Sequence, residues 1–279
     1  MNADNLNVRE LFDVSGRIAV ITGGSGGLGS AIARGLAGAG MKVAVLSRRG
    51  EMCERVAADI RSAGGEAIGV SCDVSSRTSL EQAGETVAAE FGRVDVLVNA
   101  AGGSDPRAAT DSEHAFFDLD TKALERVLDV NLTGTMRACQ VFGRDMAKRG
   151  EGCIINIASL MSFRPFSRVS AYAAAKAGIV NFTQWLATHM AREYSPRIRV
   201  NAIAPGFFLT ELNRYLLIDA KTGDLSPRGR AAVEHTPMGR MGTPDELVGT
   251  LLWLVSPASA FVTGVTVPVD GGFCAYAGV

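Results

Sequence analysis

The chain has 279 residues, and its 28 lysines and arginines against 29 aspartates and glutamates leave a formal net charge of −1. This balance, with no basic run longer than Arg48–Arg49, excludes the electrostatic footprint of a protein that binds nucleic acid or an anionic membrane surface. A hydrophobic content of 47% with 20% charged residues supplies a sizeable core and disfavours a disordered chain.

The N-terminal residues 1–10 are polar, and no stretch of the sequence approaches the roughly 20 apolar residues that a membrane-spanning helix needs. The 5 cysteines are an odd number at wide spacing without a C-x-x-C pair, which favours reduced thiols in a reducing compartment. The 3 histidines lack the spacing of metal ligands. We therefore expect a soluble, cytoplasmic protein without a catalytic metal.

From residue 17 onward, short β-branched runs alternate with longer Ala- and Leu-rich stretches, as in a parallel sheet covered by helices. Several runs are apolar throughout, which indicates strands buried on both faces. The expected strands are 17–22, 42–46, 67–72, 94–99, 153–158, 197–204 and 265–269. The expected helices are 28–39, 51–63, 77–91, 121–149, 171–193 and 244–255. The fold class is therefore α/β, a Rossmann-like doubly wound sheet of seven parallel strands with helices on both faces.

Two segments are too long to be simple connectors. Residues 103–120 are polar and contain Pro106, and residues 207–240 contain Pro227, Pro237 and several glycines among charges. Segments of this length and composition are usually functional loops, and the second is expected to be a substrate lid. Because no linker or composition break divides the sequence, residues 1–279 are expected to form a single dinucleotide-binding domain.

A glycine-rich turn joins the first expected strand to the first expected helix. It reads Thr22-Gly23-Gly24-Ser25-Gly26-Gly27-Leu28-Gly29. Glycines let the backbone approach a pyrophosphate closely, and the amides at a helix N-terminus donate hydrogen bonds to it. A glycine turn alone also occurs in flexible loops, but the strand before it and the helix after it indicate dinucleotide binding.

The second expected strand ends at Leu46-Ser47-Arg48-Arg49. Proteins that bind NAD usually carry a carboxylate near this position, which bonds the ribose hydroxyls. Here no carboxylate repels a 2′-phosphate, and the planar fork of Arg48 matches phosphate oxygens. The sequence therefore favours NADP(H), with NAD(H) still open. A solvated arginine pair is the alternative interpretation.

Tyr172 and Lys176 are four residues apart in an expected helix, so their side chains share one face. Proton exchange at neutral pH requires the pKa of tyrosine to fall by about 3, which corresponds to roughly 4 kcal/mol. A cation about 4 Å away, at an effective dielectric constant near 20, supplies about 4 kcal/mol. Ser159 ends a strand at the edge where such sheets bind ligands and is suited to orient a carbonyl oxygen. Alone, the Tyr–Lys pair also fits an ordinary surface pair.

Together these residues resemble the short-chain dehydrogenase/reductase family over nearly the whole chain. The resemblance rests on the glycine turn, on Asn99-Ala100-Ala101-Gly102, on Asp129-Val130-Asn131-Leu132-Thr133-Gly134, and on Ser159, Tyr172 and Lys176. The family often has a second asparagine where Ala100 stands. The resemblance implies a catalytic set of Asn131, Ser159, Tyr172 and Lys176. It implies cofactor contacts from Gly23, Ser25, Gly27, Leu28, Gly29, Ser47, Arg48, Asp73, Val74, Asn99, Ala100, Ala101, Gly102, Tyr172, Lys176, Pro205, Gly206 and Thr210.

The resemblance also implies a mechanism. Tyr172 protonates a carbonyl oxygen, or accepts the alcohol proton, while hydride moves from or to the nicotinamide. Lys176 lowers the pKa of Tyr172 and bonds the nicotinamide ribose, Ser159 fixes the substrate oxygen, and Asn131 links Lys176 to water. It further implies a homotetramer, and the apolar faces of the expected helices at 121–149 and 171–193 suit subunit contacts.

Within the family, several segments resemble the short-chain type of D-mannonate oxidoreductases, also called fructuronate reductases. They include 116–120, 140–143, 181–186, 204–211, 235–240 and 269–276. This resemblance implies interconversion of D-fructuronate and D-mannonate. A sugar acid needs a cation for its carboxylate, and Arg107 and Arg164 are the first candidates, followed by Arg168, Asn213 and Arg214.

Two other readings stay open. One is a reductase of another carbonyl, either a gluconate-type keto acid or a 3-oxoacyl thioester. The thioester would need a basic patch for its carrier, which the sequence does not display. The other is a non-catalytic dinucleotide sensor, which has no use for the intact set of Asn131, Ser159, Tyr172 and Lys176.

Overall fold

The structure, a computed structural model, describes residues 7–111 and 114–278. Over these ranges the strands form one sheet of seven parallel strands in the order β3-β2-β1-β4-β5-β6-β7. Each strand lies within two residues of its predicted position, so the predicted fold class is confirmed. The strands are β1 Ile18–Thr22, β2 Lys42–Ser47, β3 Glu66–Ser71, β4 Val96–Asn99, β5 Gly152–Ile157, β6 Ile198–Pro205 and β7 Thr266–Val269.

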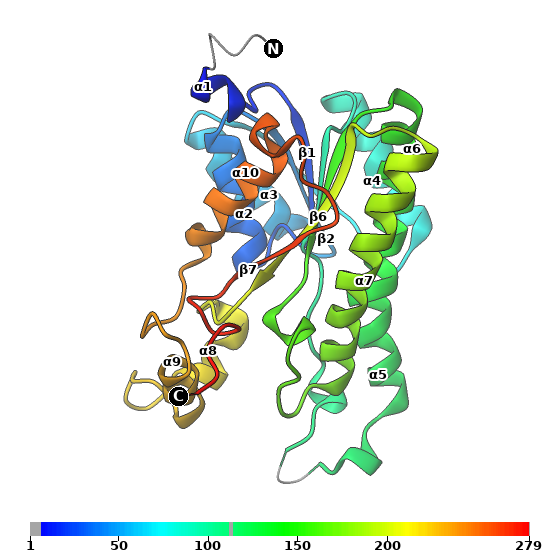
Figure 1. The fold of residues 1–279 in the computed structure, drawn as a ribbon. Helices are drawn as coiled ribbons and strands as arrows, with labels where there is room; N and C mark the ends of the chain where they lie inside the picture. Colours follow the sequence, from blue (N-terminus) through cyan, green and yellow to red (C-terminus); the bar gives the residue numbers. More distant parts are fainter. Residues whose placement is uncertain (1–6, 112–113, 279) are drawn as a thin grey trace.

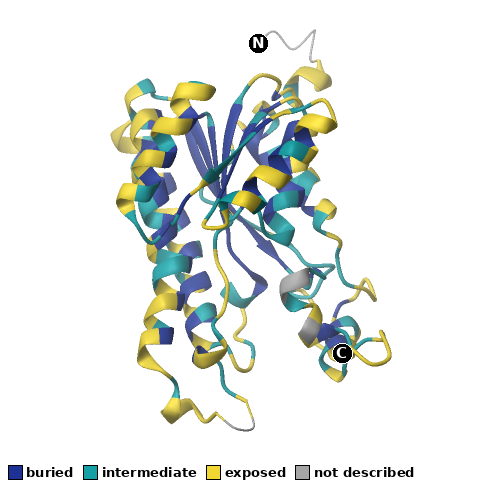
Figure 2. Ribbon diagram, turned by 180° about the vertical axis from the view of Figure 1, so that it is seen from behind, coloured by how far each residue is buried: buried dark blue, intermediate teal, exposed yellow. Residues whose placement is uncertain are grey.

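Helices cover both faces of this sheet (Figure 1). One face carries α2 (Gly27–Gly38), α3 (Gly50–Ser62) and α10 (Val248–Val255), and the other carries α4 (Arg77–Glu90), α6 (Gly134–Arg149) and α7 (Ser170–Glu193). Successive residues of a strand point to opposite faces, so Ile21 packs in the first core and Val20 in the second. This double burial explains the uninterrupted apolar runs, and Figure 2 shows the strands as the buried centre of the molecule.

The predicted continuous helix at 121–149 is interrupted. It consists of α5 (Thr121–Leu128), a π-helical turn at Asp129–Thr133, and α6. The hydroxyl of Thr135 donates to the carbonyl of Asn131 at 2.9 Å. A π-helical turn disturbs the regular ladder of backbone hydrogen bonds and is frequent at functional sites. Here it contains Asn131, whose side chain is fully buried.

Residues 207–240, expected as a functional loop that forms a lid, contain two helices, α8 (Glu211–Leu217) and α9 (Pro227–Glu234). The start of α9 follows ordinary capping chemistry, because Ser226 accepts from the amide of Gly229 at 3.0 Å and proline occupies the first turn. In Figures 1 and 2 both helices lie beside the C-terminus. Residues 103–120 contain short 3₁₀ turns at Pro106–Ala108 and Phe116–Asp118, and positions 112–113 lie outside the described residues.

Within the described ranges, no helix combines the length and the apolar character needed to cross a membrane. Those ranges also contain no group of three or more His, Cys, Asp or Glu side chains arranged to hold a metal ion. All five cysteines are free thiols, and Cys53, Cys72, Cys139 and Cys153 are buried.

Candidate active site

A cavity of about 640 Å³ lies at the carboxyl ends of the strands. It spans the point where β1 has β2 on one side and β4 on the other, which is where the chain reverses direction along the sheet. Ligands of open α/β sheets bind at such a switch point. Nearly all predicted site residues line this cavity: Gly23, Ser25, Gly27, Leu28, Gly29, Ser47, Arg48, Asp73, Val74, Ala100, Ala101, Gly102, Ser159, Tyr172, Lys176, Pro205, Gly206, Thr210 and Asn213.

The glycine turn after β1 is packed too tightly for larger residues. Gly23 has φ +69°, and a Cβ there would lie 2.6 Å from the carbonyl oxygen of Ala100. A Cβ on Gly29 would collide with the carbonyl of Gly23. The backbone is therefore bare where it faces the cavity, at the N-terminus of α2. This cradle fits a pyrophosphate, whose charge the helix amides and dipole favour.

The end of β2 lies beside this turn. The hydroxyls of Ser25 and Ser47 are 2.7 Å apart, and the guanidinium of Arg49 is 3.4 Å from the Ser25 hydroxyl. Arg48 and Arg49 both line the cavity, so sequence reasoning missed Arg49. The acidic lining residue on this side is Asp73, which follows β3 and accepts from the amide of Ser75 at 2.9 Å. Two cations thus stand where an NAD-binding protein usually places a carboxylate.

Ser159, Tyr172 and Lys176 meet at the opposite part of the cavity. Lys176 is 4% exposed and donates from Nζ to the carbonyl of Ile157 at 2.7 Å. The same Nζ lies 5.6 Å from the centre of the Tyr172 ring. Ser159 caps a short turn by accepting from the amide of Met161 at 3.2 Å. Ser159 therefore follows the end of β5, and Lys176 is bonded to that strand end from α7. Tyr172 lies in the first turn of α7.

Burial shifts the pKa of both Tyr172 and Lys176. It raises the pKa of the Tyr172 phenol, an effect that the hydrogen bond with the Ser159 side chain opposes. It lowers the pKa of Lys176 to about 8. The prediction of a lowered Tyr172 pKa is therefore wrong: in this structure the pKa of the phenol is raised. The reason is that desolvation dominates, while the ammonium group of Lys176 is directed at the carbonyl of Ile157.

Asn131 lies behind the cavity wall. Its Nδ2 donates to the carbonyls of Gly103 at 2.7 Å and Val127 at 2.8 Å, and its Oδ1 accepts from the amide of Gly103 at 3.1 Å. A Cβ on Gly102 would lie 2.5 Å from Asn131 Oδ1 and 3.4 Å from Lys176 Nζ. Gly102 therefore allows the amide of Asn131 and the ammonium group of Lys176 to approach the same short stretch of backbone.

Besides Asn131, five predicted candidates do not line the cavity: Asn99, Arg107, Arg164, Arg168 and Arg214. Asn99 is buried in the sheet, where its Nδ2 donates to Asn156 Oδ1 at 2.9 Å. Arg107 is exposed and pairs with Asp105 at 2.7 Å, because both belong to the same short turn. Arg164 is exposed in the loop between Ser159 and Tyr172.

Asn213 lines the cavity but is occupied with capping α8. Its Oδ1 accepts from the amide of Thr210 at 2.8 Å, and its Nδ2 donates to the carbonyl of Phe208 at 2.7 Å. Thr210 in turn packs against the glycine turn, because a Cβ on Gly27 would lie 2.9 Å from the Thr210 side chain. The amide of Asn213 is thus committed to holding α8 against the glycine turn.

Sequence reasoning also missed the outer wall of the cavity. Phe166 and Phe207 are stacked with ring centres 5.7 Å apart, and Phe273 of the C-terminal tail lies 5.4 Å from each. Phe166, Phe207 and Arg228 line the cavity. The run Phe207–Phe208 directly after β6 was a usable signal for an apolar wall, whereas nothing in the sequence pattern connects Arg228 to Ser159.

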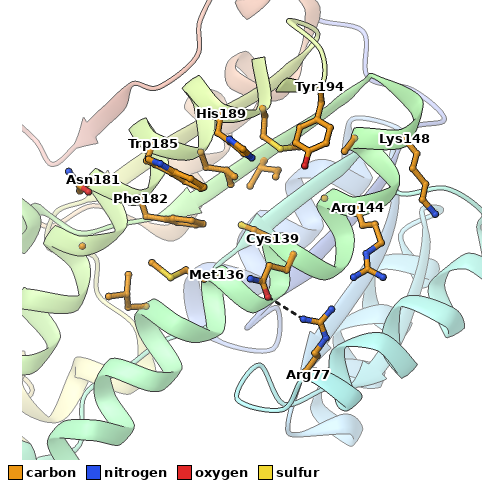
Figure 3. A pocket seen from close by; sticks show the side chains of 18 residues that line it. Arg77, Met136, Cys139, Arg144, Lys148, Asn181, Phe182, Trp185, His189 and Tyr194 are labelled. Atoms are coloured by element: carbon orange, nitrogen blue, oxygen red, sulfur yellow. Dashed lines mark hydrogen bonds between the residues drawn. The ribbon is translucent and has the colours of Figure 1, made fainter. Parts of the chain in front are cut away.

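A second and larger hollow, about 1060 Å³, lies between α6 and α7. Figure 3 shows the aromatic side chains Phe182, Trp185 and His189 along α7 and Tyr194 directly after it, facing Met136 and Cys139 of α6, with Arg77, Arg144 and Lys148 at the rim. Trp185 stacks on His189 with ring centres 4.8 Å apart, yet Trp185 is 57% exposed. This hollow contains none of the residues of the catalytic set.

Comparison with known proteins identifies relatives along nearly the whole chain. The family model described as short chain dehydrogenase matches residues 17–220. The uncharacterized oxidoreductase UxuB of Bacillus subtilis (strain 168) is 49% identical over 276 residues, which cover 96% of this chain and 98% of that protein.

Solved structures of the same fold hold nicotinamide cofactors. An NAD-bound protein of Haemophilus influenzae, provisionally assigned as a D-mannonate oxidoreductase, matches with a TM-score of 0.90 and 39% identity, covering 98% of this chain and 100% of that one. A gluconate 5-dehydrogenase from Burkholderia cenocepacia J2315, in complex with NADP and tartrate, matches with a TM-score of 0.85 and 34% identity, covering 97% and 100%.

The buried charge of Lys176 predicts a stability cost that depends on pH. Its pKa is about 8 in the folded chain against 10.5 ordinarily, so the unfolded chain binds the proton more tightly. The cost is roughly 3 kcal/mol below pH 8 and is lost as the pH rises from 8 to 10.5. We expect Lys176→Met to raise the free energy of unfolding at pH 7 by about 1 to 3 kcal/mol, and the thermal midpoint with it. This range allows for loss of the hydrogen bond to Ile157.

Thermal unfolding at pH 7 and pH 10 measures this effect, with Lys122→Met, at an exposed position of α5, as the matched control. The gain of Lys176→Met should shrink at the higher pH, and the control should show no such dependence. A Lys176→Met variant that is less stable than the wild type at pH 7, or whose difference ignores pH, contradicts the prediction.

Proposed function

This chain belongs to the short-chain dehydrogenase family and is an NAD(P)-dependent oxidoreductase acting on alcohol or keto groups, and from that premise we propose that it interconverts D-fructuronate and D-mannonate. The observation that carries the proposal is the single cavity that joins Ser159, Tyr172 and Lys176 to the glycine cradle. The similarity to the Haemophilus influenzae protein that is provisionally assigned as a D-mannonate oxidoreductase supports the choice of substrate.

In the proposed reaction, Tyr172 is the general acid and base. When bound, the nicotinamide supplies hydride to the ketone or accepts it from the alcohol. The hydroxyl of Ser159, next to the phenol, holds the substrate oxygen and orients it toward Tyr172. Tyr172 donates its proton to that oxygen during reduction and accepts it during oxidation.

Lys176 and Asn131 are proposed to serve Tyr172 from behind. The ammonium group of Lys176 lies 5.6 Å from the Tyr172 ring centre, so its charge partly offsets the cost of the phenolate that remains after proton donation, a cost that burial dominates. Its pKa of about 8 suits a group that passes a proton near neutral pH. Asn131, held by the backbone of Gly103 and Val127, completes the proposed path from Lys176 toward water.

The glycine turn and the strand ends are proposed to bind the cofactor along the cavity, with its adenine and its nicotinamide at different strand ends. The turn takes the pyrophosphate, Asp73 and Val74 take the adenine side, and Ala100 to Gly102 with Pro205, Gly206 and Thr210 flank the nicotinamide side. Arg48 and Arg49 favour NADP(H), because their guanidinium groups can pair with the 2′-phosphate.

We further propose that residues 1–279 act as one dinucleotide-binding domain in which residues 207–240 cover the substrate. Phe207, Phe208, Asn213, Leu217 and Arg228 support this, since they line the same cavity as the glycine turn. The cytoplasm is the proposed compartment, in agreement with the five free thiols.

The hollow between α6 and α7 is proposed as a contact between copies of this chain in a homotetramer. Exposed aromatic rings beside an apolar hollow disfavour a free surface, and Trp185 and Tyr194 are 57% and 54% exposed. A second copy is the occupant that the family resemblance implies. Arg77, Arg144 and Lys148 form a polar rim around the apolar centre (Figure 3), as interfaces usually have.

The function is tested by mixing the protein with NADPH and a panel of D-fructuronate, 5-keto-D-gluconate and an acetoacetyl thioester, and following the loss of reduced-nicotinamide absorbance. D-fructuronate should give the highest kcat/KM. Tyr172→Phe should lower kcat by at least about 10³-fold, because the proton donor is removed, and leave NADPH binding within threefold by fluorescence titration. A higher kcat/KM for either other substrate overturns the substrate proposal, and full activity of Tyr172→Phe overturns the mechanism.

Cofactor choice is tested with Arg48→Gln. Loss of one charge-assisted hydrogen bond to a phosphate should raise the KM for NADPH about tenfold and leave the KM for NADH within twofold. Arg55→Gln is the matched control, because Arg55 lies on α3 outside the cavity lining. A wild-type protein that clearly prefers NADH removes Arg48 from the site.

The oligomer is tested by light scattering after gel filtration. The wild type should elute as four copies, and Trp185→Glu, which places a charge in the aromatic row, should yield smaller species with unchanged circular dichroism. Phe12→Glu, a substitution of an exposed aromatic residue next to α1 and away from the hollow, is the control. A tetramer that tolerates Trp185→Glu places the contact elsewhere.

A further inference from the structure

Arg228 is a cation in the substrate part of the cavity without a partner in the described chain. It is the second residue of α9 and lines the cavity together with Ser159 and Tyr172. Its side chain is half-buried, and over the described ranges its guanidinium makes neither an ion pair nor a hydrogen bond. Even a half-buried arginine normally finds acceptors for some of its five donors. This one faces a space that a ligand can occupy.

The surroundings of Arg228 favour an anionic ligand. The nearby wall is apolar, formed by the stacked Phe166 and Phe207 and by Leu217. Burial lowers the pKa of Arg228, and the charge of Arg168 lowers it further. Asp73 is the one acidic residue among the described lining residues. It follows β3, which is at the opposite edge of the sheet from β6 and β7. Among the described side chains, none therefore neutralises the positive charge at this end of the cavity.

Arg168 approaches from the loop between Ser159 and Tyr172. Within the described ranges, Arg168 alone among the non-glycine residues has a positive φ, +82°. A large side chain rarely adopts this conformation, which costs about 1 kcal/mol or more. The backbone carbonyl of Arg168 accepts from the amide of Thr110 at 2.9 Å, which pins the loop to the 103–120 segment. The structure thus accepts local strain at the residue whose charge adds to that of Arg228.

We propose that Arg228 binds the carboxylate of the substrate and thereby makes the enzyme specific for sugar acids, while the charge of Arg168, an exposed residue outside the cavity lining, adds to the attraction from a distance. The inference rests on the proposed function. In D-fructuronate the carboxylate is at the opposite end of the carbon chain from the ketone. With that carboxylate on Arg228, the ketone end extends toward Ser159 and Tyr172 in the same cavity. The planar fork of arginine matches the two oxygens of a carboxylate.

This assignment replaces Arg107 and Arg164 as candidates for the carboxylate. Arg107 already has a carboxylate partner in Asp105, and neither residue lines the cavity. Arg48 and Arg49 line it, but at the end of β2, beside the glycine turn and Ser25. The two positive ends of the cavity thus have separate ligands, the cofactor phosphate at one and the substrate carboxylate at the other.

The test compares two substrates that differ only in the carboxylate, D-fructuronate and D-fructose. Arg228→Gln should lower kcat/KM for D-fructuronate about 30-fold and change that for D-fructose less than threefold, while NADPH binding is unaffected. Arg228→Lys should recover part of the loss. Arg168→Asn should lose about threefold to tenfold, and asparagine tolerates the left-handed backbone. Arg230→Gln on the same helix is the control, since Arg230 is exposed and bonds the carbonyl of Leu225.

Calorimetric titration of D-mannonate and of neutral D-mannitol into the complex with oxidised cofactor separates this inference from the proposed function. Binding of D-mannonate that Arg228→Gln weakens about 30-fold supports the carboxylate site even if D-fructuronate is not reduced, which would sink only the proposed function. Turnover of D-fructuronate that neither Arg228→Gln nor Arg168→Asn alters overturns the inference and leaves the function standing. If the wild type binds D-mannonate no better than D-mannitol, both fall. Should Arg228→Gln fail to fold, Arg168→Asn decides alone.

Discussion

The site depends on one buried contact, the ammonium group of Lys176 on the carbonyl of Ile157. An ammonium group in a largely apolar interior is costly, and burial accordingly lowers its pKa to about 8. The contact at 2.7 Å fixes the lysine at the end of β5, and α7 carries the tyrosine one turn earlier in the chain. Because the same helix and strand hold both groups, the distance between ammonium and phenol is set by the packing of α7 on the sheet rather than by flexible loops.

The neighbouring features follow from accommodating this contact. The π-helical turn buries Asn131 behind the cavity, and Gly102 lacks the Cβ that would strike Asn131 Oδ1. A regular helix through 129–133 would change the direction of the Asn131 side chain relative to Gly103. The turn therefore disturbs regular hydrogen bonding in one helix, and it buries the Asn131 amide near Gly102, the glycine that the Lys176 ammonium group also approaches.

The sequence predicted the parts of this arrangement that have a short-range signature. Continuous apolar runs located the strands because both faces are buried, and the spacing of Tyr172 and Lys176 placed them on one helix face. The two helices in 207–240 begin at residues that favour helix starts, Thr210 with Asn213 for α8 and Ser226–Pro227 for α9. The length and polar composition of the segment favoured a loop instead. The position of Arg228 has no such signature, because α8 and α9 must fold back over the sheet before that residue reaches the cavity. The same holds for Asn99, whose amide is turned into the sheet by its pairing with Asn156.

The distribution of charge explains how a nearly neutral chain can offer sites for the two proposed anions, a cofactor phosphate and a substrate carboxylate. Its charged residues pair mostly on the surface, as Arg107 does with Asp105 and Arg240 with Glu246, where such pairs contribute little to stability. The cavity instead has cations that form no ion pair with any described side chain, Arg48 at one end, Arg228 at the other and Lys176 between them. Burial lowers the pKa of Lys176 and of Arg228, so these two charges are less stable there than in water, and the two apolar cores on either side of the sheet supply the stability that offsets this. An anionic ligand that meets these charges relieves a cost already present in the folded chain, so its binding and the stability of the site are coupled.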